Sequence, residues 1–371
     1  MEVLKLMNTN PNWREVLGTD PYNIVIKEED GFVLLKYSQL NSDFNLQIVR
    51  ECRGAVFVKE DDKWICVRRA FDKFGNYGEG YAAHINWATA SVQEKIDGSL
   101  MSVWFYEGKW HLSTNGNIDA FKAPLADFGI SFGDYFCEAL GVSWEHFLDE
   151  LDPLYCYTYE LVGPLNRVVI SYEKPTLYAI GQRDMWSMEE TVYNGPLGEK
   201  FNIFEPKRFQ LKTLEDTLKA AEAMSKDEEG FVVCDIAFNR IKIKSPQYLM
   251  AARLRNNGVI TRKRVLQMLL DETVDDFLAY CPQYVGYVNK VATEFRHLLL
   301  KMELERTYNF QIEMLDQKCF WKFLCEHNFK HKDYLMKFYN DPTITPMDFI
   351  IRQVEYRGIG WLEDYLGEEN G

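Results

Sequence analysis

A lysine followed two residues later by an Asp-Gly pair is the part of this chain best suited to covalent chemistry. Lys95 lies between apolar segments that are typical of strands, in the stretch Glu94-Lys95-Ile96-Asp97-Gly98-Ser99-Leu100. A free lysine has a pKa of about 10.4, so it attacks a phosphate only after burial or a nearby cation has favoured loss of its proton. Lys95 is therefore a candidate nucleophile for a covalent lysine–nucleotide bond. The alternative is an exposed lysine beside an Asp-Gly hairpin turn.

The residues that follow Lys95 have roles in this hypothesis. Asp97 could accept a hydrogen bond and orient the loop. Gly98 removes a side chain at a point where a nucleotide or the backbone must approach closely. The pattern is short and arises often by chance, so its interpretation depends on the rest of the chain.

Two further lysines share one face of a predicted strand. Apolar and basic residues alternate in Ile241-Lys242-Ile243-Lys244, and successive side chains of a strand point to opposite faces. Lys242 and Lys244 would therefore lie side by side, where they can grip a phosphate and supply positive charge near Lys95. The alternative is an edge strand whose lysines guard it against pairing with another chain.

These residues need a framework of sheets, and the sequence predicts one from about residue 22 to residue 245. Runs of β-branched and aromatic residues, broken by glycine or acidic turn residues, are typical of strands. The predicted strands are Ile24–Ile26, Phe32–Tyr37, Gly54–Val58, Trp64–Val67, Val92–Ile96, Met101–Tyr106, Tyr155–Val162, Arg167–Tyr172, Thr176–Ile180, Phe231–Val233 and Ile241–Lys244. Between them, Thr213 and Asp216 resemble a capping box that begins a helix ending at about Met224.

After Ser245-Pro246 the sequence predicts helices only. Amphipathic patterns cover Gln247–Asn256, Thr261–Tyr280, Val285–Tyr308, Gln317–Asn328, Lys332–Tyr339 and Pro346–Tyr356. We therefore expect an α+β fold with a domain boundary near residue 246. Residues 1–246 would form a domain of antiparallel sheets with flanking helices, and residues 247–371 an all-α domain.

Composition and charge narrow the class of protein. The 371 residues suffice for two or three domains, and a net charge of −14 argues against a protein that coats nucleic acid generically, although a local basic groove remains compatible with it. We find neither a run of about 18 apolar residues nor a signal peptide. The eight cysteines form no Cys-x-x-Cys pair, which favours a reducing cytosol. We expect a cytoplasmic protein.

Five motifs accompany Lys95 in a fixed order. They are Glu51-Cys52-Arg53-Gly54, Lys73-Phe74-Gly75-Asn76, Tyr159–Pro164 followed by Asn166-Arg167, Glu229–Val232 and Ile241–Ser245. Their order and spacing resemble the covalent nucleotidyltransferases: DNA ligases, RNA ligases and mRNA capping enzymes. Within that superfamily the chain is most similar to the phage RNA ligase 1 family, over about residues 50–245. The all-α domain that follows would be a candidate RNA-specificity module.

The resemblance implies an ATP-dependent RNA ligase, which would act in RNA repair. Lys95 would attack the α-phosphate of ATP and become lysyl-AMP, the AMP would pass to a 5′-phosphate of RNA, and a 3′-hydroxyl would then displace AMP to seal the strand. The partners would be RNA ends, including those of a structured RNA such as tRNA, and we expect a monomer. The basic run Arg253–Arg264 is the best RNA-facing candidate, against the alternative of a solvated helix face.

The resemblance also implies a role for each remaining site residue. Glu160 would bind the ribose hydroxyl, and Glu229 would orient a hydrated Mg²⁺ or Mn²⁺, because Mg²⁺ keeps much of its water and takes few protein carboxylates. Arg53 would lie near the ribose and phosphates, and Lys73 would bind a phosphate or an RNA end. Lys242 and Lys244 would neutralise phosphate charge, and Asp97 and Gly98 would belong to the nucleotide site with Lys95.

Two departures from the family pattern stand out. Gly75 replaces a common aromatic residue, so Phe74 or Tyr77 would take over any stacking role. In the Ser113–Gly116 segment, relatives carry a Lys or Arg beside the glycine where this chain has Asn115. Lys122 and Lys109 are the candidates to compensate for the missing positive charge.

Other interpretations remain open. A DNA ligase or a capping enzyme would usually carry a β-barrel after the last lysine motif, where this sequence is helical. A catalytically inactive RNA-end-binding protein is compatible with the missing cation at Asn115. A zinc site is a weaker alternative, suggested by Cys319, Cys325, His327 and His331.

Overall fold

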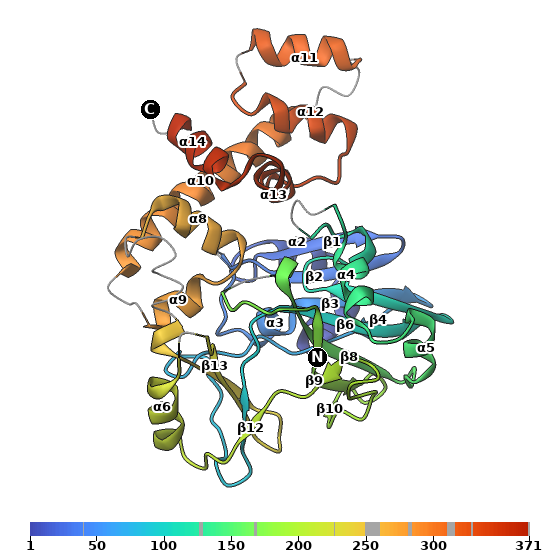
Figure 1. Cartoon of the computed structure of the whole chain (residues 1–371). Coiled ribbons are helices and arrows are strands. Elements are labelled where there is room, and N and C mark those ends of the chain that lie inside the picture. The colour runs from blue at the N-terminus through green and yellow to red at the C-terminus, as the bar shows by residue number, and fades with distance from the viewer. Residues whose placement is uncertain are drawn as a thin grey trace. The chain divides into compact units, whose positions relative to one another are not determined.

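The computed structural model describes residues 1–39, 41–125, 129–166, 169–225, 227–248, 260–280, 284–309, 316–327 and 329–369. The chain divides into two compact units, Met1–Arg255 and Asn256–Gly371. Within the described ranges, every strand belongs to the first unit and the second unit is helical (Figure 1). The predicted fold class, antiparallel sheets with flanking helices followed by a helical region, is confirmed.

The first sheet is an antiparallel array of β1 (Ile24–Glu29), β2 (Phe32–Tyr37), β3 (Arg53–Glu60) and β4 (Lys63–Arg68). One hydrophobic core contains side chains of this sheet and of three helices, α1 (Glu2–Thr9), α2 (Trp13–Gly18) and α3 (Gln47–Glu51). A side chain of α3 caps the start of helix α1. The Glu51 carboxylate accepts hydrogen bonds from the backbone amides of Glu2 and Val3, at 3.1 and 2.9 Å. The carboxylate thus satisfies two amides that the start of a helix leaves unpaired.

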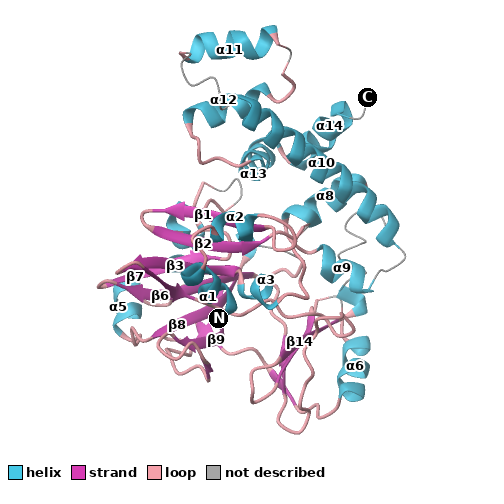
Figure 2. Ribbon diagram, turned by 180° about the vertical axis from the view of Figure 1, so that it is seen from behind, coloured by secondary structure: helices cyan, strands magenta, loops and turns pink. Residues whose placement is uncertain are grey.

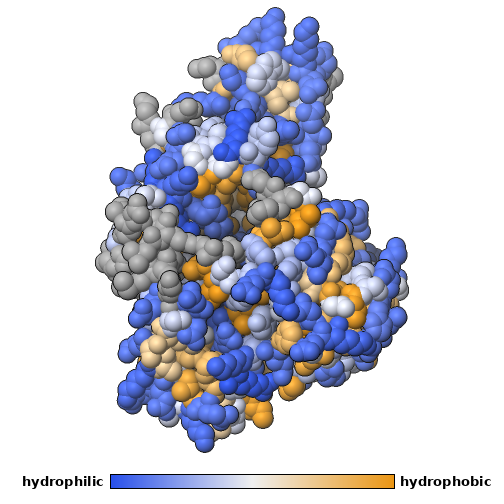
Figure 3. Space-filling model, in the orientation of Figure 1, coloured by the Kyte–Doolittle hydropathy of each residue, from blue (hydrophilic) through white to orange (hydrophobic). Residues whose placement is uncertain are grey.

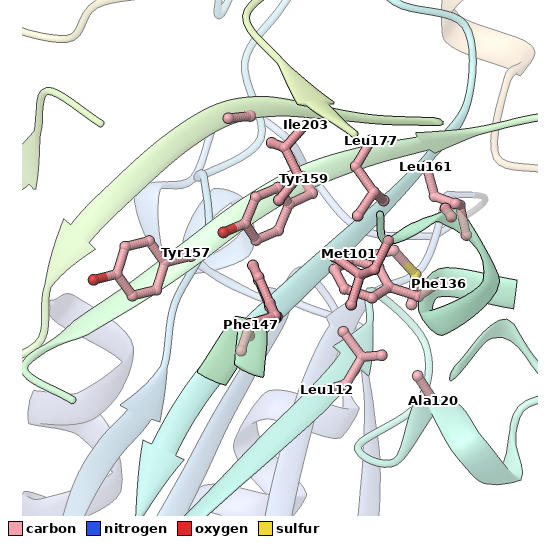
Figure 4. Close-up of a cluster of buried hydrophobic side chains, with 14 of the residues drawn as sticks. Met101, Leu112, Ala120, Phe136, Phe147, Tyr157, Tyr159, Leu161, Leu177 and Ile203 are labelled. Atoms are coloured by element: carbon pink, nitrogen blue, oxygen red, sulfur yellow. The ribbon is translucent and has the colours of Figure 1, made fainter. Parts of the chain in front are cut away.

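The second sheet has the order β10-β9-β8-β6-β7, with β11 also paired to β9. Its strands are β6 (Ser99–Tyr106), β7 (Lys109–Thr114), β8 (Tyr155–Val162), β9 (Thr176–Asp184), β10 (Glu190–Thr191) and β11 (Ile203–Phe204). In Figure 4, Tyr157 and Tyr159 of β8 lie in one buried cluster with Met101 of β6 and with Phe136 of helix α4 (Phe132–Ala139). Because side chains alternate along a strand, Glu160 faces the opposite side of this sheet.

The third sheet has the order β12-β5-β13-β14, formed by Arg208–Phe209, Ser91–Glu94, Gly230–Cys234 and Arg240–Lys244. Helix α6 (Leu214–Ala223) lies beside it in Figure 2, and both contribute to one core. Ile241 and Ile243 are buried in that core, so the opposite face of β14 carries Lys242 and Lys244, as the alternation predicts. The predicted cap is confirmed, because Thr213 accepts a hydrogen bond from the Asp216 amide.

The described helices of the second unit are α8 (Arg262–Leu270), α9 (Val274–Tyr280), α10 (Val285–Asn309), α11 (Gln317–Glu326), α12 (Lys332–Asn340), α13 (Pro346–Arg357) and α14 (Ile359–Glu369). The prediction of a single helix over Thr261–Tyr280 is wrong, because the segment forms two helices, α8 and α9. Glu272 lies between them with a φ of 58°. A left-handed residue interrupts a right-handed helix. The helix predicted over Gln247–Asn256 lies mostly outside the described residues.

One predicted strand of the first unit is also wrong. Residues 169–172 form no strand, and the other two residues of the predicted range Arg167–Tyr172 lie outside the described residues. The amides of Val169 and Ile170 bond to the carboxylate of Asp97 instead of to a neighbouring strand. The backbone N–H groups that a strand would donate to its neighbour are therefore already bonded to the side chain of Asp97.

The surface agrees with the charged composition. On the face shown in Figure 3, hydrophilic residues predominate and apolar residues form scattered patches. Among the described residues, none of the helices is both long enough and apolar enough to span a membrane. The domain boundary is predicted near residue 246, and β14, the last strand described, ends at Lys244.

Candidate active site

The third sheet brings two charged residues to Lys95 at the end of β5. The Lys95 amide donates to the carbonyl of Gly230 at 2.9 Å, which fixes the backbone of Lys95 at the start of β13. Glu229 precedes Gly230, and Lys244 pairs with Gly230 across β13 and β14. As a result, the Lys95 ammonium meets one oxygen of the Glu229 carboxylate at 2.7 Å, and the Lys244 ammonium meets the other at 2.9 Å.

This lysine–glutamate–lysine cluster is largely removed from solvent. The side chains of Glu229 and Lys244 are 3% and 6% exposed, whereas that of Lys95 retains 20%. Burial alone would disfavour the ionised form of Glu229, but the ammonium groups of Lys244 and Lys95 more than offset it and lower the pKa of this carboxyl. Glu229 therefore stays ionised, and Lys95 is the member of the cluster that an incoming molecule can reach.

Glu160 approaches this cluster from the second sheet. It pairs with Leu100 across β8 and β6, close to the turn that follows Lys95. Burial raises the pKa of Glu160 to about 7; Lys95 opposes this rise, Glu229 adds to it, and Arg53 opposes it. Near neutral pH this carboxyl is therefore divided between its neutral and ionised forms, a protonation state suited to hydrogen bonding with hydroxyl groups.

Asp97 joins the turn after Lys95 to two distant segments. One carboxylate oxygen accepts from the amides of Val169 and Ile170, at 2.8 and 2.7 Å, and the other accepts from the Tyr248 hydroxyl at 3.0 Å. The residue is buried, and burial together with the charge of Glu229 raises its pKa. The predicted hydrogen-bonding role of Asp97 is confirmed, while its contact with a nucleotide stays a prediction.

Gly98 is required by packing rather than by an unusual backbone angle. A Cβ at this position would lie 2.3 Å from the carbonyl oxygen of Leu161 and 2.8 Å from Val162 Cγ1. Real Cβ atoms do not approach a backbone oxygen so closely. Gly98 is expected to allow close approach either of a nucleotide or of backbone. In the structure it is the backbone of β8 that lies against Gly98.

Arg53 enters the site from the first sheet, beside a β-bulge. The register between β2 and β3 shifts at Gly54, which has a φ of 69° and whose Cβ would lie 2.6 Å from the carbonyl oxygen of Asn115. The Arg53 guanidinium lies over the Phe74 ring, 5.4 Å from its centroid. Its Nε and Nη1 are buried and make no hydrogen bond to a described residue. Buried guanidinium donors in this condition mark a place for an acceptor.

The segment that contains Lys73 runs along the outer edge of β14. The Lys242 amide donates to the carbonyl of Gly75 at 3.0 Å, and the Lys242 carbonyl accepts from the amide of Tyr77 at 2.8 Å. Lys242 Nζ lies 5.5 Å from the centroid of the Phe74 ring. Lys73 and Lys242 are 5% and 7% exposed. With Lys244 6% exposed as well, the burial of Lys242 and Lys244 excludes the alternative of solvated lysines that guard a strand edge.

Phe74 also lines a cavity on the side of Lys73. Its volume is about 690 Å³, and it is further lined by the cationic residues Arg50, Arg69, Arg183 and Arg240. Arg69 pairs with Asp72, and Arg183 and Arg240 both pair with Glu190. Two aromatic residues are candidates for stacking. Phe74 lies beside the cationic groups of Arg53 and Lys242, whereas Tyr77 is 48% exposed.

The two lysines predicted to compensate for Asn115 are placed elsewhere. Lys122 is exposed and pairs with Glu29 and Asp30, at 2.5 and 3.3 Å. Lys109 begins β7, at the end opposite to Asn115. Sequence reasoning also missed Tyr248, the partner of Asp97, because nothing in its local pattern distinguishes it from a core tyrosine.

The remaining predicted sites receive little support. In the described part of the chain, no group of three or more His, Cys, Asp or Glu residues is arranged to hold a metal ion. Cys319 and Cys325 are exposed, whereas His331 is buried and bonds to Tyr365. Most of the basic run Arg253–Arg264 lies outside the described residues, and Arg262 at its end pairs with Glu294.

Comparison with known proteins identifies the family. A sequence model described as RNA ligase matches residues 51–248, more than half of the chain. The chain belongs to the RNA ligase family. This region contains every residue assigned above to the site, from Arg53 to Lys244, and the predicted family is confirmed.

Two curated proteins are similar to this chain in sequence. A protein of Autographa californica nuclear polyhedrosis virus, named as a candidate bifunctional polynucleotide kinase/RNA ligase, is 27% identical over 336 residues, which cover 81% of this chain and 46% of that protein. An RNA ligase of Rhodothermus phage RM378 is 27% identical over 316 residues, covering 69% of this chain and 71% of the relative. The chain thus spans less than half of the baculovirus protein.

Solved structures show more distant likeness. An archaeal ATP-dependent RNA ligase aligns with a TM-score of 0.44 and 16% identity, over 78% of each chain. A Naegleria gruberi RNA ligase aligns with a TM-score of 0.33 and 17% identity, over 44% of this chain and 52% of that one. Likeness at this level assigns neither a ligand nor a residue to the present chain.

Proposed function

We propose that this protein is an ATP-dependent RNA ligase whose nucleophile is Lys95. The observation that carries the proposal is the buried cluster in which Glu229 holds the ammonium groups of Lys95 and Lys244. Such a cluster positions a lysine and keeps cations around it, as attack on a nucleotide requires. The match of residues 51–248 to the RNA ligase family supports the same activity.

In the first step, deprotonated Lys95 Nζ attacks the α-phosphorus of ATP. A nitrogen–phosphorus bond forms, the bond to the bridging oxygen breaks, and pyrophosphate leaves. Lys244 and Lys242 would neutralise charge on the phosphate, with Lys73 as a further phosphate-binding cation. Glu160 would hydrogen-bond the ribose, which fixes the nucleotide against Lys95.

The residues present fit a hydrated divalent cation. Glu229 is a buried carboxylate that stays ionised, and its charge raises the pKa of both Glu160 and Asp97, which places three carboxyl groups close together. A bound Mg²⁺ would supply positive charge beside the reacting phosphate and would satisfy its remaining coordination with water.

The later steps use the same cations. AMP would pass from Lys95 to the 5′-phosphate of an RNA, which forms a phosphoanhydride and frees the lysine. A 3′-hydroxyl would then attack the RNA 5′-phosphorus, form the phosphodiester and expel AMP. RNA ends with a 5′-phosphate and a 3′-hydroxyl are therefore the proposed substrates, with tRNA among the candidates and RNA repair as the role. The helical unit is the proposed RNA-specificity module.

Labelling with ATP tests this proposal. The purified chain is incubated with ATP labelled in its α-phosphate, with and without Mg²⁺, and the label that stays on the protein in a denaturing gel is measured. We expect a Mg²⁺-dependent, AMP-sized adduct that is lost in Lys95→Ala and retained in Lys109→Ala, a matched control at an exposed hairpin. Absence of the adduct in the natural chain would refute the ligase assignment, and an adduct with GTP alone would favour a capping enzyme.

A further inference from the structure

A second cation faces the bulge that carries Arg53. Lys36 of β2 pairs directly with Arg53 of β3 in the antiparallel register. Side chains of directly opposed residues emerge on the same side of a sheet, and two like charges in this arrangement destabilise it. The Arg53 guanidinium has buried donors with no partner among the described residues. Buried guanidinium donors in this condition, on the residue opposed to a second cation, mark a place for an anionic acceptor.

The Lys36 ammonium lies at the turn where the family cation is missing. Lys36 Nζ is 3.4 Å from the position that a Cβ of Gly116 would occupy. The neighbouring residue, Asn115, packs with its backbone against Gly54, next to Arg53. Lys36 thus reaches, from a different strand, the turn at which relatives carry a Lys or Arg. It does so from outside residues 51–248, the region that matches the family.

The position of this pair indicates which anion it binds. Arg53 acts electrostatically on Glu160, so its guanidinium borders the proposed ribose site. An ammonium and a guanidinium on directly opposed strand residues offer donors for phosphate oxygens, and Gly116, which has no side chain, leaves space beside the ammonium. The phosphate would belong to the nucleotide or to the RNA 5′ end, both of which must pass Lys95.

We propose that Lys36, together with Arg53, binds a substrate phosphate at the Asn115-Gly116 turn and supplies there the positive charge that residue 115 does not provide. The inference rests on the proposed ligase function, because it assigns a further residue to that site. Since the two cations belong to neighbouring strands held by the bulge at Gly54, their spacing is set by the sheet and not by a loop.

The test separates the two phosphate sources. Lys36→Met keeps the aliphatic stem and removes the charge, Lys36→Arg restores a charge, and Lys122→Met is the control at an exposed lysine paired with Glu29. For each variant, single-turnover rates are measured for lysine adenylylation by ATP and for AMP transfer to a 5′-phosphorylated oligoribonucleotide. Loss of one charged hydrogen bond predicts a decrease of about 10- to 100-fold in the step that uses the phosphate.

Each outcome decides the proposal. Slower adenylylation in Lys36→Met identifies an ATP phosphate, and unchanged adenylylation with slower transfer identifies the RNA 5′-phosphate. In either case Lys36→Arg recovers much of the rate and Lys122→Met behaves like the natural chain. Equal rates in Lys36→Met and the natural chain, or a loss that Lys36→Arg does not relieve, would overturn it.

Binding measured without turnover distinguishes failure of this inference from failure of the ligase function. In a Lys95→Ala background, the affinities for ATP and for the fluorescent 5′-phosphorylated oligoribonucleotide are compared with and without Lys36→Met. A weaker affinity for one of them supports phosphate binding by Lys36 even if the natural chain forms no adduct. Unchanged affinities for both contradict the inference.

Discussion

Replacing Glu160 by glutamine should stabilise the fold while it abolishes nucleotide binding. The carboxyl is held in a place that favours its neutral form, since burial raises its pKa from an ordinary 4.5 to about 7. A group whose pKa is raised on folding stabilises the native state fully below the unfolded pKa, and that contribution is lost as the pH rises through the folded pKa. Glutamine is neutral at every pH, so the variant does not lose this contribution to stability as the pH rises.

The size of the effect follows from the shift. A pKa that rises from 4.5 to about 7 corresponds to about 3 kcal/mol in unfolding free energy, and the difference between the two proteins reaches this value near pH 8. Near pH 4 the unfolded carboxyl is mostly protonated as well, so the difference falls to a few tenths of a kcal/mol. Titrating groups outside the site are shared by the two proteins and cancel in the comparison.

Urea unfolding of the natural chain and of Glu160→Gln, followed by far-UV circular dichroism between about pH 4 and pH 8, measures this difference. The stability of the variant should exceed that of the natural chain by an amount that grows with pH. A difference that is constant across the range would show that Glu160 is not held in its neutral form. Loss of the ATP adduct in the stabilised variant would then demonstrate that the carboxyl is retained for binding rather than for folding.

Two other substitutions test how the turn after Lys95 is held. Gly98→Ala places a methyl group against the Leu161 carbonyl, so the junction of β6 and β8 must shift; we expect a loss of about 1–3 kcal/mol in urea unfolding, and unaltered stability would contradict the packing described. Asp97→Ala removes the carboxylate that accepts from the amides of Val169 and Ile170 and from the Tyr248 hydroxyl, at a cost of about 1–3 kcal/mol for each hydrogen bond to the charged group. Asp97→Asn should cost much less, because its amide can accept from the two backbone N–H groups and donate to Tyr248; equal losses in the two Asp97 variants would exclude this arrangement.

Much of the fold and of the site could be predicted because the relevant patterns are local. The alternation in Ile241–Lys244 specifies two strand faces, and the structure places both lysines on the face opposite to the isoleucines. The motif order predicted which residues would converge, and Lys95, Glu229 and Lys244 are in contact. The structure adds that one carboxylate holds both ammonium groups.

The rest depends on contacts between distant parts of the chain. The segment Arg167–Tyr172 has the composition of a strand, but its amides at 169 and 170 bond to Asp97, which lies more than 70 residues earlier. Lys36 has no motif around it, and only the β2–β3 register brings it to Arg53. Strand β7 and helices α1 and α14 were not predicted, because their hydrophobic patterns are short or mixed with polar residues.

The Glu51 carboxylate that caps α1 bears on how this protein can be dissected. The family match begins at residue 51, so the glutamate lies inside it while the two amides that it accepts, those of Glu2 and Val3, lie outside. Strands β1 and β2 are excluded as well, and with them the neighbour of Arg53. A fragment cut at the edge of the shared sequence would therefore expose one side of β3 and leave a buried carboxylate without its donors. The segment that the family model matches is smaller than the compact unit in which it lies.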